Sequence, residues 1–177
     1  MGSLSWRTTL GAYTLFLMRQ AVIVRHGGPE ALEIRESPDP APGRGEVRIR
    51  VRAAGINFAD VLARLGWYPD APKPPMVVGY EVAGTVDAVG EGVAGFARGE
   101  RVTALTRFGG YSDTVICASA QAFHTPSRLS DTEAAAIPVK QIQVRPNGNL
   151  FRHTTSFLLP AGIVCELCGR RESGTIV

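Results

Sequence analysis

The sequence predicts a mainly β (α+β) fold, a partly open barrel with short helices, followed by an irregular C-terminal tail. Short runs rich in β-branched residues are separated by glycine turns, and two short stretches have helical spacing. After Val139 no period is sustained. The chain has 177 residues, which suffices for one domain with its own core but not for two full domains.

The first half of this fold begins with a hairpin. Residues 20–25 and 32–36 are predicted strands because they alternate around a Gly27–Gly28 turn. The next strand, 46–53, alternates apolar residues with arginine and glutamate, so its arginines are expected to face solvent rather than form an anion site. A short helix over 57–65 follows, with Asn57 as its N-cap.

The second half is organised around residues 79–102, GYEVAGTVDAVGEGVAGFARGERV. Strands are predicted at 82–89 and 101–105, joined by a glycine-rich loop. Further strands are expected within 109–116 and at 121–124. Ser130 followed by Glu133 is a capping box, which predicts a helix over 130–137.

Charge and cysteine content restrict the location and partners. The net charge of +3 comes from 19 basic and 16 acidic residues scattered along the chain, so no nucleic-acid partner is expected. The apolar run from Leu10 to Met18 is too short to cross a bilayer, and membrane association is not evident. Three cysteines make no disulfide framework, which favours a cytoplasmic location.

The stretch 79–102 resembles the GroES-like domain of the medium-chain dehydrogenase/reductase family. In that family a glycine–glutamate run leads into V-G-x-G-V and then into G-[DE]-R-V. The matching residues are Gly79, Glu81, Gly84, Val86, Gly90, Gly92, Val93, Gly99, Glu100, Arg101 and Val102. The resemblance covers about 19–139, which defines a GroES-like domain between an N-terminal extension (1–18) and a divergent tail (140–177).

Metal-dependent members of this family place a cysteine and a histidine at positions where this chain has Asn57 and Tyr80. Neither side chain replaces a thiolate or an imidazole as a zinc ligand, so no metal site is expected. This double departure resembles the zinc-independent quinone oxidoreductase branch. Within that branch, AGINFADVLARLGWY and AFHTPSRLSDTEAAAIPV look most like the vesicle amine transport protein homologues.

The resemblance implies hydride transfer from NADPH to a quinone or conjugated carbonyl, and it implies three catalytic residues. Asn57 would hydrogen-bond near the nicotinamide or the substrate carbonyl, and is also the cofactor-binding candidate. Tyr68 would donate from its loop, and Asp60 would fix the cleft wall. Each has a structural alternative: Asn57 only caps the helix, Asp60 only favours its dipole, and Tyr68 only packs.

Two further sets of residues have less specific interpretations. Glu81, a carboxylate between apolar strand residues, is expected to form a structural ion pair with an arginine rather than to act as an acid or base. Cys165 and Cys168 form C-x-x-C after His153, but without a second pair they are interpreted as thiols in a loosely ordered tail.

The predicted function is the substrate-side domain of an NADPH-dependent quinone or enone reductase. The chain has no glycine-rich phosphate loop, so the Rossmann domain is expected to be missing and the chain truncated and inactive alone, with no NADPH bound. The alternative is a non-catalytic isoform that acts as a binding or interaction module. Full-length relatives are expected to be dimers. Residues 1–18 are either a flexible extension ahead of a start at Met18 or a targeting segment.

Overall fold

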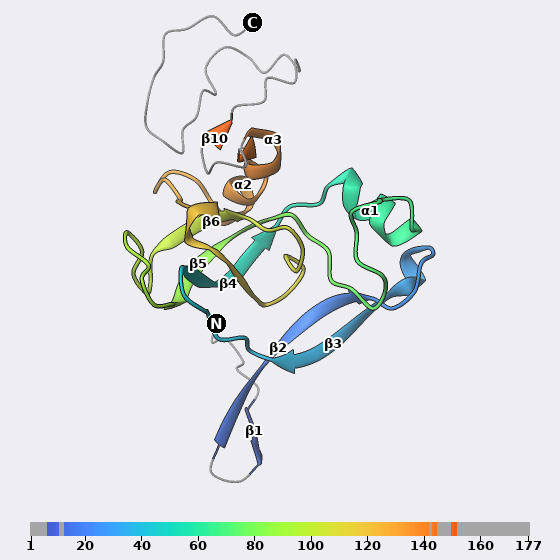
Figure 1. The fold of residues 1–177 in the computed structure, drawn as a ribbon, viewed down its shortest axis with the longest axis horizontal. Helices are drawn as coiled ribbons and strands as arrows, with labels where there is room; N and C mark the ends of the chain where they lie inside the picture. The colour runs from blue at the N-terminus through green and yellow to red at the C-terminus, as the bar shows by residue number, and fades with distance from the viewer. Residues whose placement is uncertain (1–6, 11–12, 142, 145–149, 152–177) are drawn as a thin grey trace, which may run out of the picture.

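The computed structural model describes residues 7–10, 13–141, 143–144 and 150–151, with side chains described for residues 17–139. The predicted fold class is confirmed: a curled five-stranded sheet with a separate hairpin beneath it and short helices at its ends (Figure 1). The strands are β1 (Arg7–Leu10), β2 (Tyr13–Ile23), β3 (Leu32–Pro38), β4 (Glu46–Ala54), β5 (Glu81–Val89), β6 (Arg101–Leu105), β7 (Thr114–Ala118), β8 (Ala122–His124), β9 (Gln143–Val144) and β10 (Leu150–Phe151). The helices are α1 (Phe58–Leu65), α2 (Asp131–Ala135) and α3 (Pro138–Gln141), with 3₁₀ turns η1 (Pro29–Ala31) and η2 (Ser119–Gln121).

The five-stranded sheet contains the main core. Its strand order is β7-β4-β5-β6-β8, and all neighbouring strands are antiparallel. Burial alternates along β4, where Val47 and Ile49 are fully buried, because successive side chains point to opposite faces. The valines of β5 and β6 complete this core, so the middle of the sheet is where apolar side chains are most fully buried.

Two arginines of β4, Arg48 and Arg50, lie on its other face and pair with carboxylates. Arg48 contacts Asp87 at 2.7 Å, and Arg50 contacts both Asp87 and Asp39. Asp87 is on the neighbouring strand β5, so these pairs cross the sheet. The alternation predicted for this strand is therefore correct. Its paired arginines bind carboxylates of the same chain and do not form an anion site.

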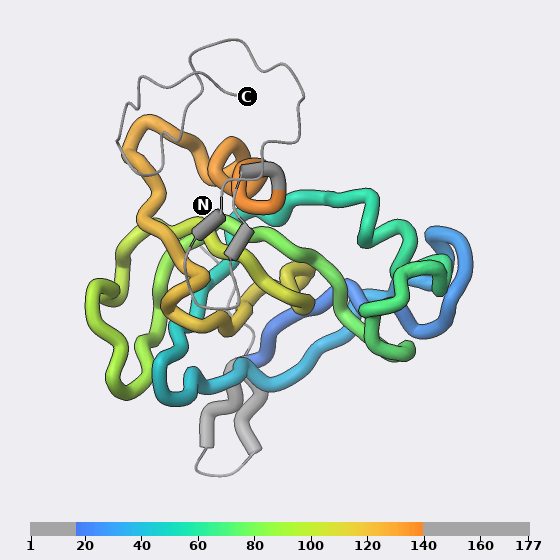
Figure 2. Tube along the Cα trace, turned by 45° about the horizontal axis from the view of Figure 1, so that its top comes forward, coloured from blue at the N-terminus to red at the C-terminus, as the bar shows by residue number. Residues whose placement is uncertain are grey.

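The hairpin differs from the sequence prediction at its N-terminal end. Strand β2 begins at Tyr13 and pairs with β1 and β3, so it runs across the expected boundary at residue 18. Met18 is buried, with 7% of its surface exposed. The turn after β2 lies beside the end of α1, where Gly27 N–H donates to Arg64 C=O at 3.0 Å (Figure 2).

The helix predicted over 130–137 is present as α2, and a further helix that was not predicted follows it. Ser130 and Glu133 form the expected capping box, but α2 ends at Ala135 and a second helix, α3, begins at Pro138. A proline is favoured at the start of a helix and not in its interior, which explains the break. Beyond α3 only the β9–β10 pair is described, so most of the predicted tail lies outside the described residues.

Candidate functional site

Helix α1 begins at the residue that the sequence singled out. Asn57 is the extended N-cap, and its backbone N–H donates to Asp60 Oδ2 at 2.7 Å. The helix ends at Gly66, which adopts the left-handed conformation with a φ of 81°. The buried residues of this helix are Asp60 and Ala63, whereas Phe58, an apolar residue at helical spacing, is 75% exposed.

Asp60 is the centre of a buried cluster that we call the Asp60 network: the carboxylate and its donors Asn57 N–H, Gly79 N–H and the Tyr111 hydroxyl. Gly79 donates at 3.0 Å and Tyr111 at 2.8 Å. Asp60 is 5% exposed, and three donors offset the cost of burying its charge. Burial, followed by the hydrogen bond to Asp60, raises the pKa of Tyr111 well above its usual value.

Asn57 also reaches Glu81, the first residue of β5. The Asn57 amide donates to Glu81 Oε1 at 3.1 Å, and the Val139 N–H donates to Oε2 at 2.8 Å. Glu81 is 2% exposed, so its carboxylate is held between the start of α1 and the start of α3. A Cβ at Gly55 would collide with this carboxylate, so the chain needs glycine there. The ion pair with an arginine stays a prediction.

A pocket of about 210 Å³ lies at the start of α1, and we call it the α1 pocket. Its wall combines one amide, three hydroxyls and apolar groups. The lining residues are Asn57, Ala59, Tyr68, Tyr80, Leu105, Thr106 and Val139. Ligand pockets commonly measure about 300–1,000 Å³, so this one suits a single small ring.

Aromatic rings form one side of the α1 pocket. Tyr68 and Tyr80 meet edge to face with centroids 6.0 Å apart, and Tyr80 and Phe108 are 5.4 Å apart. The backbone before Tyr80 is fixed, because Gly79 has a φ of 107° and its carbonyl accepts from Thr106 Oγ1 at 2.7 Å. Burial raises the pKa of Tyr80 well above its usual value, with nearby Tyr68 and Asp60 adding to the effect. Its hydroxyl therefore stays protonated at neutral pH.

Asn57 and Tyr80 stand at the two positions that carry metal ligands in the metal-dependent proteins that this chain resembles. Both residues line the α1 pocket. Among the residues that the structure describes, no cluster of three or more metal-ligating side chains is found. Cys165, Cys168 and His153 lie outside the described residues. The wall of the α1 pocket therefore offers hydrogen bonds rather than metal ligation.

The structure brings two of the three predicted catalytic residues together. Asn57 and Tyr68 both line the α1 pocket, whereas Asp60 lies behind the wall and orders it through its network. Sequence reasoning missed Tyr111, which is 51 residues from Asp60 in the chain and has no local signal of that contact. The sequence identified Tyr80 only as a residue that does not bind zinc, and not as part of the pocket wall. Tyr80 and Asn57 both stand at positions that carry metal ligands in the family that this chain resembles, and this shared property was a usable signal that the two residues lie close together.

A larger hollow of about 470 Å³ lies between the hairpin and β4. Arg19 and Asp113 line it, and they already neutralise each other at 2.9 Å. Neither Asn57 nor Tyr68 contributes to its wall. We therefore place the candidate site at the smaller α1 pocket.

Comparison with known proteins identifies the region around this pocket. Residues 43–127 match the alcohol dehydrogenase GroES-like domain. The rat synaptic vesicle membrane protein VAT-1 homolog is 42% identical over 127 residues, covering 71% of this chain and 31% of the rat protein. This chain spans only about a third of the length of its curated relatives, from 29% of the mouse VAT-1 homolog-like protein to 38% of the quinone oxidoreductase of Lama guanicoe.

Two solved structures share the fold. The human VAT-1 homolog-like protein superimposes with a TM-score of 0.69 at 35% identity, covering 70% of this chain and 40% of that one. Escherichia coli quinone oxidoreductase complexed with NADPH gives a TM-score of 0.63 at 35% identity, covering 66% of this chain and 36% of that one. Within the described residues, no helix is long and apolar enough to cross a membrane.

Proposed function

We propose that this chain, which belongs to the medium-chain dehydrogenase/reductase family through its GroES-like domain, forms the substrate side of a zinc-independent quinone or enone reductase. The observation that carries the proposal is the neutral, hydrogen-bonding wall of the α1 pocket, formed by Asn57, Tyr68 and Tyr80. Amides and phenol hydroxyls orient a carbonyl oxygen without a metal, which is what such a substrate needs.

The proposed cofactor is NADPH, which is bound in the similar quinone oxidoreductase structure. The donors around the α1 pocket fit a carboxamide or carbonyl group, and NADPH when bound supplies a hydride. In this chain Asn57 would orient the bound ring, because its own amide is held by Glu81 at 3.1 Å. Tyr68 would donate to the bound oxygen from the loop after α1, and Asp60 would keep the wall in place. We propose a cytoplasmic location for this activity.

The test is binding of a small enone, cyclohexenone, to the 177-residue chain, followed by two-dimensional NMR. We expect saturable shifts at residues around Asn57, Tyr68 and Tyr80. Ala59→Leu fills the α1 pocket and should abolish the binding, whereas Ala21→Leu fills the larger hollow and should leave it unchanged. No saturable binding, or shifts confined to the hollow, would contradict the proposal.

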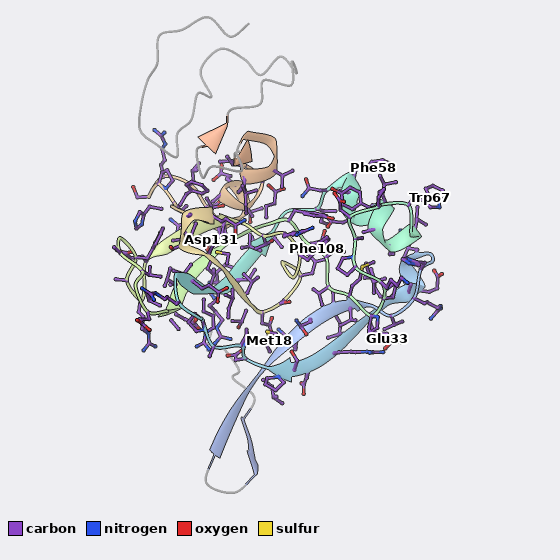
Figure 3. The ribbon with its side chains drawn as sticks, viewed as in Figure 1. Met18, Glu33, Phe58, Trp67, Phe108 and Asp131 are labelled. Atoms are coloured by element: carbon purple, nitrogen blue, oxygen red, sulfur yellow. The ribbon has the colours of Figure 1, made fainter. Side chains whose placement is uncertain are left out.

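A second candidate is a non-catalytic binding module, and the apolar surface around α1 favours it. Ile56, Phe58 and Trp67 are 82%, 75% and 71% exposed. Phe58 and Trp67 stand out from α1 toward the outside of the molecule (Figure 3). Sedimentation of the wild type and a Phe58→Ser/Trp67→Ser variant separates the two candidates: an association that the variant loses, without enone binding, would favour the binding module.

A further inference from the structure

The Tyr80 hydroxyl is a buried polar group without a partner. Among the residues that the structure describes, four buried side-chain oxygens have no hydrogen-bond partner. They belong to Asp39, Tyr80, Thr114 and Thr125. Of these four residues, only Tyr80 lines either of the two pockets described above. Leaving a buried hydroxyl unpaired is unfavourable, so this one needs an explanation.

The surroundings of Tyr80 hold its ring but leave its hydroxyl unused. The ring is packed between Tyr68 and Phe108, and Gly79 before it is fixed from both sides by Asp60 and Thr106. A Cβ at Gly79 would lie only 2.8 Å from the Tyr111 backbone nitrogen, so a residue with a side chain does not fit at this position. The backbone before Tyr80 is therefore closely confined. Tyr68 is a polar side chain close to this hydroxyl: besides burial, both its charge and a weak hydroxyl–hydroxyl interaction raise the pKa of Tyr80, but the contact falls outside the distances and angles of a hydrogen bond.

We propose that Tyr80 determines the specificity of the α1 pocket by donating a hydrogen bond from its hydroxyl to the carbonyl oxygen of a small cyclic ketone or enone. This inference rests on the proposed function and names one more residue of the same site. The Tyr68 ring meets the Tyr80 ring edge to face from a loop outside any helix or strand, so a shift of the Tyr68 ring within the pocket wall would expose the Tyr80 hydroxyl to the ligand. The remaining rings then contact the face and edge of the ligand.

Tyr80→Phe should weaken ligand binding without lowering the melting temperature, and this combination distinguishes a binding role from a structural one. Tyr80→Phe removes an unpaired hydroxyl and keeps the ring, so the melting temperature should stay the same or rise. Tyr111→Phe is the matched control, because its hydroxyl donates to Asp60 at 2.8 Å outside the α1 pocket. It should lower the melting temperature by several degrees, because it removes a hydrogen bond that is made in the free protein.

The binding experiment titrates cyclohexanone, cyclohexenone and cyclohexane into the full 177-residue chain and follows the shifts by NMR. We expect Tyr80→Phe to weaken the binding of both carbonyl ligands by about five- to tenfold, the usual value of one hydrogen bond. The binding of cyclohexane, which has no acceptor, should not change. Discrimination of this kind arises when a site is built to pair a polar group of its ligand.

Each outcome decides the proposal. Equal binding of the carbonyl ligands to wild type and Tyr80→Phe overturns it while leaving the proposed function intact. A fall in melting temperature like that of Tyr111→Phe also overturns it, because the hydroxyl would then be satisfied in the free protein, for example by water. If both ketone and enone bind with the same dependence on Tyr80, the inference holds, because both ligands carry the carbonyl oxygen that accepts the hydrogen bond. If neither carbonyl ligand binds, both proposals fail.

Discussion

The Asp60 network and the α1 pocket both lie at the start of α1, and they use their polar groups differently. In the network, the Asp60 carboxylate accepts three hydrogen bonds from Asn57, Gly79 and Tyr111. In the pocket, the Tyr80 hydroxyl is buried without a partner. Saturated groups hold a conformation, whereas an unsaturated group beside a cavity is available to a ligand. Stability and recognition are therefore separated within a few residues of the chain.

The largest effect should come from removing the centre of the network. Asp60→Ala leaves three donors without their acceptor, so we expect the free energy of unfolding to fall by about 3 kcal/mol or more. Denaturant unfolding measures this loss. Asp70→Ala, at an exposed position, is the control and should change it by less than about 0.5 kcal/mol. Equal effects of the two substitutions would show that the network contributes no stability.

A smaller effect is expected at the junction of the two regions. Gly55→Ala pushes a methyl group into the Glu81 carboxylate, which should cost about 1–3 kcal/mol of unfolding free energy. The displaced carboxylate would also pull on Asn57 and so weaken ligand binding in the α1 pocket. In a Glu81→Ala background this extra cost should disappear. Additive effects of the two substitutions would contradict the proposed clash.

The smallest effect on stability should come from the wall of the α1 pocket. Tyr68→Phe removes a pocket-lining hydroxyl whose contact with the Tyr80 hydroxyl falls outside hydrogen-bond geometry, so the unfolding free energy should change by less than about 0.5 kcal/mol. Tyr111→Phe should cost about 1 kcal/mol by the same measurement. If Tyr68→Phe proved as costly as Tyr111→Phe, the separation of stability from recognition would be wrong.

The local elements of the fold were predictable because their signals are local. Asn57 and Gly66 mark the two ends of α1, and Ser130 with Glu133 marks the start of α2. The boundary at residue 18 does not coincide with an element end, because β2 continues from its pairing with β1 over 13–16 into its pairing with β3 over 17–23. Pairing between strands depends on residues far apart in the chain, and a single sequence carries no direct record of it.

The sequence predicted which residues belong to the candidate site, but not which of them line the pocket and which support its wall. Asn57 and Tyr68 were selected and share one pocket, but sequence could not place Asp60 behind the wall. That placement depends on Gly79 and Tyr111, which approach from 19 and 51 residues away. Tyr80 was visible only as the wrong residue for a metal, because its missing hydrogen bond is a property of the folded chain.

Asn57 connects two carboxylates at once, and this constrains how related sequences can change. Its backbone N–H serves Asp60 and its side-chain amide serves Glu81, so the two acidic residues share one donor residue. An aspartate at position 57 would add a third negative charge between them, and a leucine would leave Glu81 without that donor. Among homologues without the metal ligands, substitutions at positions 57 and 81 should therefore co-vary.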